Sequence, residues 1–291
     1  MRSFPVRNLS AKLVLAPTIL AMAVCFYGAI LWTTYISFTR SGLLPNYTFV
    51  GIDQYVRLFN TGRWLTAYTN MFLFGGLFIA GALALGTLLA ILIDSRVRFE
   101  GVFRAIFLYP LSMSFIVTGL AWQWFLSPTI GLQSFVRDLG WQSFTFDWIV
   151  HRETAVYTLV FAAMWHSSGL IMAIMLAGLR SIDAEIWRAA RIDGIPRARV
   201  YLNIVLPMLR PLVVTCVVLL AVAVVKSYDL VVAMTGGGPG NASDLPGKFV
   251  VDLTFERANI GLASAAAVVM LVSILLALAP YLYVELARRN R

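Results

Sequence analysis

Long apolar runs alternate with short polar segments along the whole of this 291-residue chain. Each run reaches about the 20 residues that a helix needs to cross the hydrocarbon core of a bilayer. Backbone groups find no water there, so a crossing segment must pair them internally, as a helix does. The pattern therefore predicts an all-α membrane protein with six transmembrane helices. The six runs are Leu13–Phe38, Met71–Ile93, Ala105–Leu126, Ala155–Leu179, Pro211–Asp229 and Ile260–Leu286.

The composition favours a single membrane domain. Hydrophobic residues make up 60% of the chain and charged residues 13%, whereas soluble domains have about half and a quarter. The polar segments are too short for a separate soluble domain, so we expect one transmembrane domain over residues 1–291, with its core at about 66–285. The first run exceeds the roughly 7–15 apolar residues of a signal peptide, and we expect it to be a retained helix.

The basic residues predict the orientation. With the N-terminus inside, the inside segments hold fifteen Lys and Arg residues and the outside segments hold eight. Cationic residues accumulate on the cytoplasmic side of a membrane, so both termini are expected to be cytoplasmic. The same placement beside lipid accounts for the net charge of +9 without a nucleic-acid partner, because the basic residues flank membrane helices.

The longest inside loop, about residues 180–210, reads as two short helices with a corner. Asp183 is placed to cap the first helix, about Ala184–Asp193, and Glu185 lies in its first turn, where the helix dipole favours an anion. Gly194 is placed to end this helix, because glycine adopts a left-handed backbone without penalty. Pro196 suits the start of the second helix, and the prolines at 207 and 211 predict a bend on entering the membrane.

This loop resembles the EAA loop of ABC importer permeases, in which Glu-Ala-Ala is followed at fixed spacing by Gly and by Ile-x-Leu-Pro. The matching positions are Ala189, Ala190, Gly194, Ile204, Leu206 and Pro207. The resemblance implies a type I ABC importer permease fold, in which this helix is the coupling helix that seats in a cleft of an ATP-binding subunit.

The residues that the resemblance implies in coupling to the ATPase are Glu185, Arg188, Ala189, Ala190, Asp193 and Gly194. One position departs from the motif: Arg188 occupies the place of its glutamate and has the opposite charge. A salt bridge from that position would be lost or replaced, and Glu185, one turn earlier, is a substitute.

A second segment, Met234-Thr-Gly-Gly-Gly-Pro239, predicts a sharp turn on the outer side. Together with the EAA-like loop it resembles the first permease subunit of carbohydrate importers, the branch of the larger maltose-importer membrane subunit, and this resemblance covers nearly the whole chain. It implies a bacterial inner-membrane protein in a heterodimer with a second permease, two copies of a cytoplasmic ATP-binding subunit, a periplasmic or lipid-anchored sugar-binding protein, and a sugar substrate.

Polar and aromatic residues inside the apolar runs are candidates for contact with the substrate, since such residues are costly in a membrane unless they serve packing or passage. In the larger maltose subunit, which the chain resembles, substrate contacts lie on the helices before and after the coupling loop. The candidates on the corresponding helices are Trp165, His166, Ser167, Ser168, Ser227, Tyr228 and Asp229.

Each candidate has a structural alternative. His166 could instead form a hydrogen bond to a neighbouring helix. Asp229 could form a local ion pair with Lys226. Trp122 and Trp124, which close the third run, are more typical of anchors at the membrane interface than of ligands.

The chain contains no phosphate-binding loop, so we expect no ATPase site and no cofactor, with ATP and Mg²⁺ bound by the partner. We also expect no catalytic residues and no metal site, because His, Asp and Glu do not cluster at triad or ligand spacing. The alternative to an ATP-driven sugar permease is an ion-coupled sugar carrier that acts without an ATPase. Such carriers usually place an acidic residue deep in a helix, and the runs lack one between their ends except Glu285 near the exit of the last.

Overall fold

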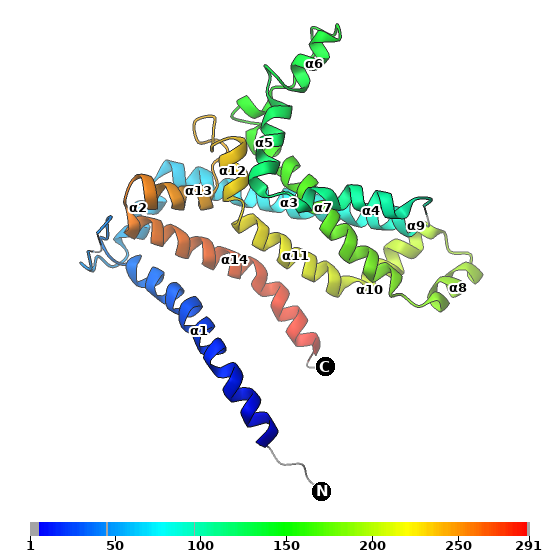
Figure 1. Ribbon diagram of the computed structural model, residues 1–291, viewed down its shortest axis with the longest axis horizontal. Coiled ribbons are helices and arrows are strands. Elements are labelled where there is room, and N and C mark those ends of the chain that lie inside the picture. The colour runs from blue at the N-terminus through cyan, green and yellow to red at the C-terminus, as the bar shows by residue number, and fades with distance from the viewer. Residues whose placement is uncertain (1–5, 45, 96, 290–291) are drawn as a thin grey trace. The chain divides into compact units, whose positions relative to one another are not determined.

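The computed structural model describes residues 6–44, 46–95 and 97–289, drawn in Figure 1. Its elements are helices joined by turns, and the described residues contain no strand beyond an isolated bridge between Thr39 and Phe49. Contacts divide the chain into two compact units, Met1–Thr61 with Val250–Ser273 and Gly62–Phe249 with Ile274–Arg291. That the whole chain forms one domain stays a prediction.

Four helices of the described chain are long and apolar enough to cross a bilayer unbroken. They are α1 (Val6–Ile36), α3 (Gly62–Asp94), α7 (Ala155–Arg180) and α14 (Ile260–Arg289). With two bent pairs of helices counted as one span each, the number of candidate spans becomes six. All six apolar runs are thus largely helical, which confirms the predicted all-α membrane class.

The first bent pair corrects the third predicted helix. Instead of one helix over Ala105–Leu126, the chain forms α4 (Glu100–Leu108) and the 3₁₀ turn η1 (Tyr109–Ser112), then bends by 101° into α5 (Phe115–Leu126). Pro110 lies in η1, where its missing N–H ends the regular ladder. Ser114 then caps α5, because its hydroxyl accepts a hydrogen bond from the backbone N–H of Val117.

The second bent pair follows the predicted loop. The segment Arg197–Met208 meets α11 (Arg210–Val225) at 72°, so the bend expected from Pro207 and Pro211 is confirmed. The predicted fifth run, however, extended to Asp229, whereas α11 ends at Val225. Tyr228 and Asp229 belong to a separate short helix, α12 (Tyr228–Met234).

The smaller unit joins the end of α1 to the start of α14. The hydroxyl of Ser37 lies 2.7 Å from that of Tyr55 on α2 (Asp53–Phe59), and the Gln54 amide donates to the Thr39 carbonyl. The N–H of Gly261 donates to the carbonyl of Ser41, and a Cβ at Gly261 would crowd the Thr39 carbonyl. The close approach of these segments therefore requires glycine at 261.

The larger unit is organised around α3 and α7, which lie side by side (Figure 1). Small residues allow this contact: a Cβ at Gly86 would overlap Ile171 of α7. On another part of α7, a Cβ at Gly169 would overlap the Phe107 carbonyl of α4. The α11 helix packs on α3, and α12 packs on α5.

The remaining elements of the described chain are short. They are α6 (Leu132–Asp138), η2 (Trp148–Val150), α8 (Ala184–Ile192), α9 (Arg197–Val200), the π-helical turn η3 (Tyr201–Val205), α10 (Leu206–Met208), α13 (Pro246–Val251) and the π-helical turn η4 (Asp252–Glu256).

Candidate functional site

The first candidate site is the α8 helix, which is capped at both ends as its sequence predicts. The Asp183 carboxylate accepts a hydrogen bond of 2.9 Å from the N–H of Glu185. At the other end Gly194 has φ +67°. The N–H of Ile195 donates to the Ala190 carbonyl and that of Gly194 to the Arg191 carbonyl, which together form a Schellman motif. The helix is therefore a defined rigid unit although it has only nine residues.

Most side chains predicted to couple to a partner are exposed on α8 or just after it. The exposed ones are Glu185, Arg188, Ala189, Asp193 and Gly194. Ala190 is buried instead, with 5% of its surface exposed. Ile192 is 86% exposed, so the helix also presents an apolar side chain to its surroundings. One face thus anchors α8 and the other is free to bind a partner.

A chain of contacts attaches α8 to the helical core. The Trp187 ring meets the Tyr201 ring edge-on at 5.2 Å, and the Tyr201 hydroxyl lies 3.4 Å from Asp94 Oδ2 at the end of α3. Arg180, the last residue of α7, lies 3.8 Å from Asp94 and 2.8 Å from Glu100 of α4. These partners are far apart in the sequence, and the local patterns that identified α8 carry no signal for them.

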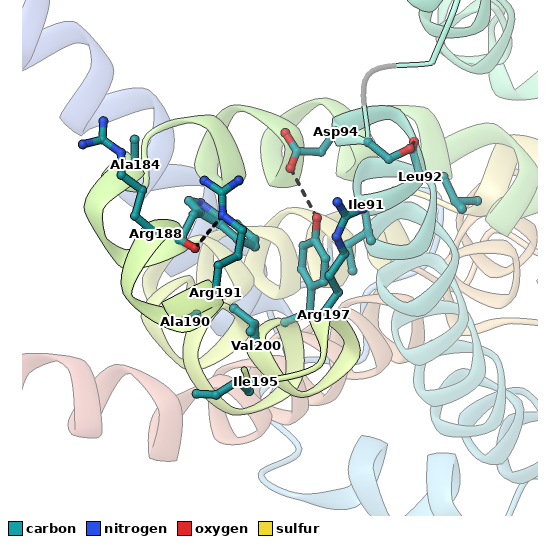
Figure 2. A pocket seen from close by; sticks show the side chains of 13 residues that line it. Ile91, Leu92, Asp94, Ala184, Arg188, Ala190, Arg191, Ile195, Arg197 and Val200 are labelled. Carbon is teal, nitrogen blue, oxygen red and sulfur yellow. Dashed lines mark hydrogen bonds between the residues drawn. The ribbon is translucent and has the colours of Figure 1, made fainter. Parts of the chain in front are cut away.

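Between α8 and the end of α3 lies an open pocket of about 540 Å³, which we call the α8 pocket. Figure 2 shows the side chains that line it, among them Ile91 and Leu92 of α3, Arg191 of α8 and Arg197 of α9. Apolar and cationic groups therefore face the same space.

The second candidate site is the middle of α7, where His166 and its neighbours were proposed to contact a substrate. His166 is buried, and its Nδ1 lies 3.0 Å from the Thr118 hydroxyl of α5. Its ring stacks on Phe115 with centroids 4.3 Å apart. The structural alternative for His166, a hydrogen bond to a neighbouring helix, is therefore present. Contact with a substrate stays a prediction.

The other candidates on α7 lie beside His166. Trp165 meets the Trp122 ring edge-on at 5.7 Å, so both tryptophans belong to one aromatic cluster between α5 and α7. Ser167 and Ser168 are buried, and the Ser168 hydroxyl donates to the Trp165 carbonyl of its own helix.

The candidates after α11 are not arranged as one group. Ser227 is buried, and its hydroxyl donates to the Val224 carbonyl. Tyr228 is partly buried and Asp229 is exposed, both at the start of α12. The ion pair considered between Asp229 and Lys226 is not among the contacts of the described residues, because α12 starts a new helix after a break at Ser227.

The turn predicted from three consecutive glycines is confirmed and lies against the first part of α3. Gly236 and Gly237 have φ +60° and +85°, and the Gly238–Pro239 bond is cis. The turn is followed by Asp244, whose fully buried carboxylate lies 2.6 Å from Arg63 Nε. The Asn70 amide donates to the carbonyls of residues 242 and 244. The sequence indicated the turn but not this buried ion pair.

No group of three His, Cys, Asp or Glu residues in the described chain is arranged to hold a metal ion. The site consists of a short capped helix attached to the ends of α3 and α7, and of a buried polar patch between α5 and α7.

Comparison with known proteins gives a consistent result. Residues 82–291 match the family model described as the binding-protein-dependent transport system inner membrane component. A probable ABC transporter permease of Pyrococcus horikoshii is 37% identical over 273 residues, which cover 93% of this chain and 94% of the relative. The xylose/arabinose import permease of Haloferax volcanii is 31% identical over 268 residues, 91% of this chain and 84% of the relative.

The fold is also found in a solved structure, that of a bacterial alginate ABC transporter in complex with an alginate pentasaccharide-bound periplasmic protein. The match has a TM-score of 0.78 at 22% identity and covers 94% of both chains. The apolar helices, the capped α8 loop and these matches agree with one another. The chain belongs to the family of binding-protein-dependent transport system inner membrane components.

Proposed function

We propose that this chain is one permease subunit of an ATP-driven sugar importer. It pairs with a second permease, two copies of an ATP-binding subunit and an external sugar-binding protein, and both of its termini are cytoplasmic. ATP and Mg²⁺ are bound by the partner, and this chain needs no cofactor. The asymmetry of basic residues supports the orientation. The xylose/arabinose and alginate transporters among the similar proteins support a carbohydrate as the substrate class.

The observation that carries the proposal is the construction of α8. A nine-residue helix capped at both ends presents an exposed face, while Ala190 and Trp187 hold it against the rest of the loop. A rigid helix with one anchored face can transmit movement of a bound subunit to the bundle as a lever. On this helix Arg188 is exposed where related loops carry a glutamate, so its partner on the ATPase carries a complementary carboxylate.

Sugar passes between the permease halves, and the aromatic and polar residues between α5 and α7 are its proposed contacts. The Nδ1 atom of His166 forms a hydrogen bond with the Thr118 hydroxyl, and within the described residues its Nε2 atom forms none. Trp165 and Trp122 supply aromatic faces beside it. Aromatic faces with a few placed polar groups are the usual composition of a site for a small ligand.

The test uses the transporter complex that contains this chain, purified and then reconstituted with its binding protein. ATPase activity is measured with pentoses, hexoses and disaccharides, for the wild type and for Arg188→Glu and Ala189→Glu. Both substitutions place an acidic side chain on the exposed face of α8, and we expect sugar-stimulated hydrolysis to fall about tenfold, the effect of losing one interface hot spot.

The matched control is Ala198→Glu, which adds the same charge at an exposed alanine of α9 in the same loop. It should keep the wild-type stimulation. Solute uptake without any ATPase, driven by an ion gradient and insensitive to the α8 variants, would overturn the proposal in favour of the ion-coupled carrier. Nothing in the comparisons supports that carrier.

A further inference from the structure

Contact of α8 with an ATPase does not by itself explain which residues line the α8 pocket. The pocket lies on the side of α8 that faces the end of α3, and its volume of about 540 Å³ is large enough for a small-molecule ligand. One wall continues the apolar surface of α3 through Ile91 and Leu92, and Leu92 is 52% exposed. Arginines of α8 and α9 also line the pocket, so its lining is amphiphilic.

The arginines of the pocket are available for an anion. Arg191 of α8 and Arg197 of α9 are exposed, and within the described residues neither forms an ion pair. Figure 2 shows the side chains of Arg191 and Arg197 among those that line the space between α8 and α3, and Arg188 of α8 lines the same pocket. Arg191 uses its Nε for the Trp187 carbonyl, which orients the guanidinium and leaves its other N–H groups free.

Asp94 supplies the one carboxylate of the lining, and it already contacts two other side chains. Asp94 lies 3.4 Å from the Tyr201 hydroxyl and 3.8 Å from Arg180. Arginine side chains therefore outnumber carboxylates in the lining. A guanidinium presents paired donors that match a phosphate group in geometry as well as in charge.

The depth of the pocket identifies the source of the phosphate. The α3 candidate span ends at Asp94 and the bent pair that begins with α9 starts at Arg197, so in the proposed orientation both elements are expected at the cytoplasmic boundary of the membrane. Headgroups lie at this level, with acyl chains beside the apolar end of α3. An anionic phospholipid matches the cationic and the apolar lining residues at once, whereas a free phosphate would leave the apolar ones unused.

We propose that the α8 pocket binds an anionic phospholipid, with Arg191 and Arg197 on its phosphate and its acyl chains along the end of α3. The inference rests on the proposed orientation, because anionic lipid is the partner expected on the cytoplasmic side. A lipid in this position fills the space between α8 and α3 and couples the loop to the bundle.

The experiment uses the intact complex in detergent, without sugar or ATP, and counts retained lipids by native mass spectrometry after equilibration with phosphatidylglycerol or phosphatidylcholine. The wild type should retain phosphatidylglycerol about tenfold more strongly than phosphatidylcholine, since a charged hydrogen bond contributes about that factor. The double variant Arg191→Gln/Arg197→Gln should lose this preference.

The matched control is Arg199→Gln, which removes an exposed arginine of the same loop that does not line the pocket. It should retain phosphatidylglycerol as the wild type does. Arg191→Lys/Arg197→Lys keeps the charge and should restore part of the preference, which separates loss of the site from loss of the fold.

Three results would overturn the inference. The double variant could retain phosphatidylglycerol unchanged. Millimolar inorganic phosphate could displace the lipid fully, which would assign the site to free phosphate. The double variant could release the ATPase while keeping its lipid, which would assign the arginines to a protein carboxylate. A failed sugar response in the ATPase assay would instead count against the proposed function alone, because lipid retention is measured without sugar.

Discussion

The two ends of α3 each lie beside an arginine–aspartate pair, and the two pairs differ in burial. Arg63 Nε lies 2.6 Å from Asp244, with side chains 14% and 0% exposed. Arg180 Nε lies 3.8 Å from Asp94, with side chains 42% and 21% exposed. Water screens the second pair, whereas loss of one partner in the first leaves a charge with little solvent around it.

The difference shows where the bundle is fixed and where it can adjust. The Asp244 segment is held by the ion pair and by two hydrogen bonds from Asn70. At the other end Arg180 contacts both Asp94 and Glu100, and it can exchange one carboxylate for the other at low cost. The loop that carries α8 is attached at this adjustable end, as a lever that moves between discrete arrangements requires.

The largest effect is expected at the buried end. Asp244→Ala should destabilise the protein by about 3–5 kcal/mol, because it removes the fully buried carboxylate that contacts Arg63 Nε at 2.6 Å. The measurement is thermal unfolding of the purified complex. Asp229→Ala removes an exposed aspartate and should leave the unfolding temperature nearly unchanged. Equal effects of the two variants would refute the claim that burial separates them.

A smaller, local effect is expected at Gly194, where α8 depends on backbone conformation and not on charge. Gly194→Ala places a Cβ on a residue with φ +67° and should destabilise the loop by about 1 kcal/mol. Hydrogen exchange of the α8 amides should accelerate, while that of α3 stays unchanged. Gly101→Ala, in α4 and with open space around it, is the control and should be neutral or stabilising.

Substitution of Arg180, at the adjustable end of α3, should change the coupling of ATP hydrolysis to transport more than it changes the stability of the protein. Arg180→Gln removes contacts that are already partly in water, so the unfolding temperature should change little. The ATP hydrolysed per sugar transported should rise, because α8 is then less firmly tied to α3 and α7. Arg63→Gln should instead lower the unfolding temperature strongly, because it removes one partner of the buried pair. A coupling ratio that remains at the wild-type value in Arg180→Gln would contradict the lever.

The smallest effect is expected at a hydrogen-bonded pair that is still more exposed. His151 Nε2 lies 3.0 Å from Asp147, and this hydrogen bond holds the pKa of Asp147 below its ordinary value. A lowered pKa stabilises the folded protein at pH values above the ordinary aspartate pKa, and that contribution is lost as the pH falls through the lowered value. His151→Gln should raise the pKa of Asp147, as read from the carboxyl carbon shift in a pH titration. An unchanged pKa would show that the contact is not formed in solution.

The features that could be predicted from sequence depend on residues close to one another along the chain. The apolar runs identify the spans because any helix that crosses lipid must be apolar for most of its length. Asp183 and Gly194 mark the ends of α8 because a cap depends on the conformation and hydrogen bonds of residues within one turn. The glycines before Pro239 predict the turn for the same local reason.

Pro110 and the Ser114 cap are local causes of the break of the third run at Met113. Tertiary structure alone decided the separate helix that contains Tyr228 and Asp229 and the choice of ion pairs. Arg63 meets Asp244 and Arg180 meets Asp94 only because segments distant in sequence pack side by side. A helix that is apolar on all sides carries no periodic signal for the face that meets a neighbour. That face is set by close packing of small residues such as Gly86 and Gly169, and this packing exists only once the helices have assembled.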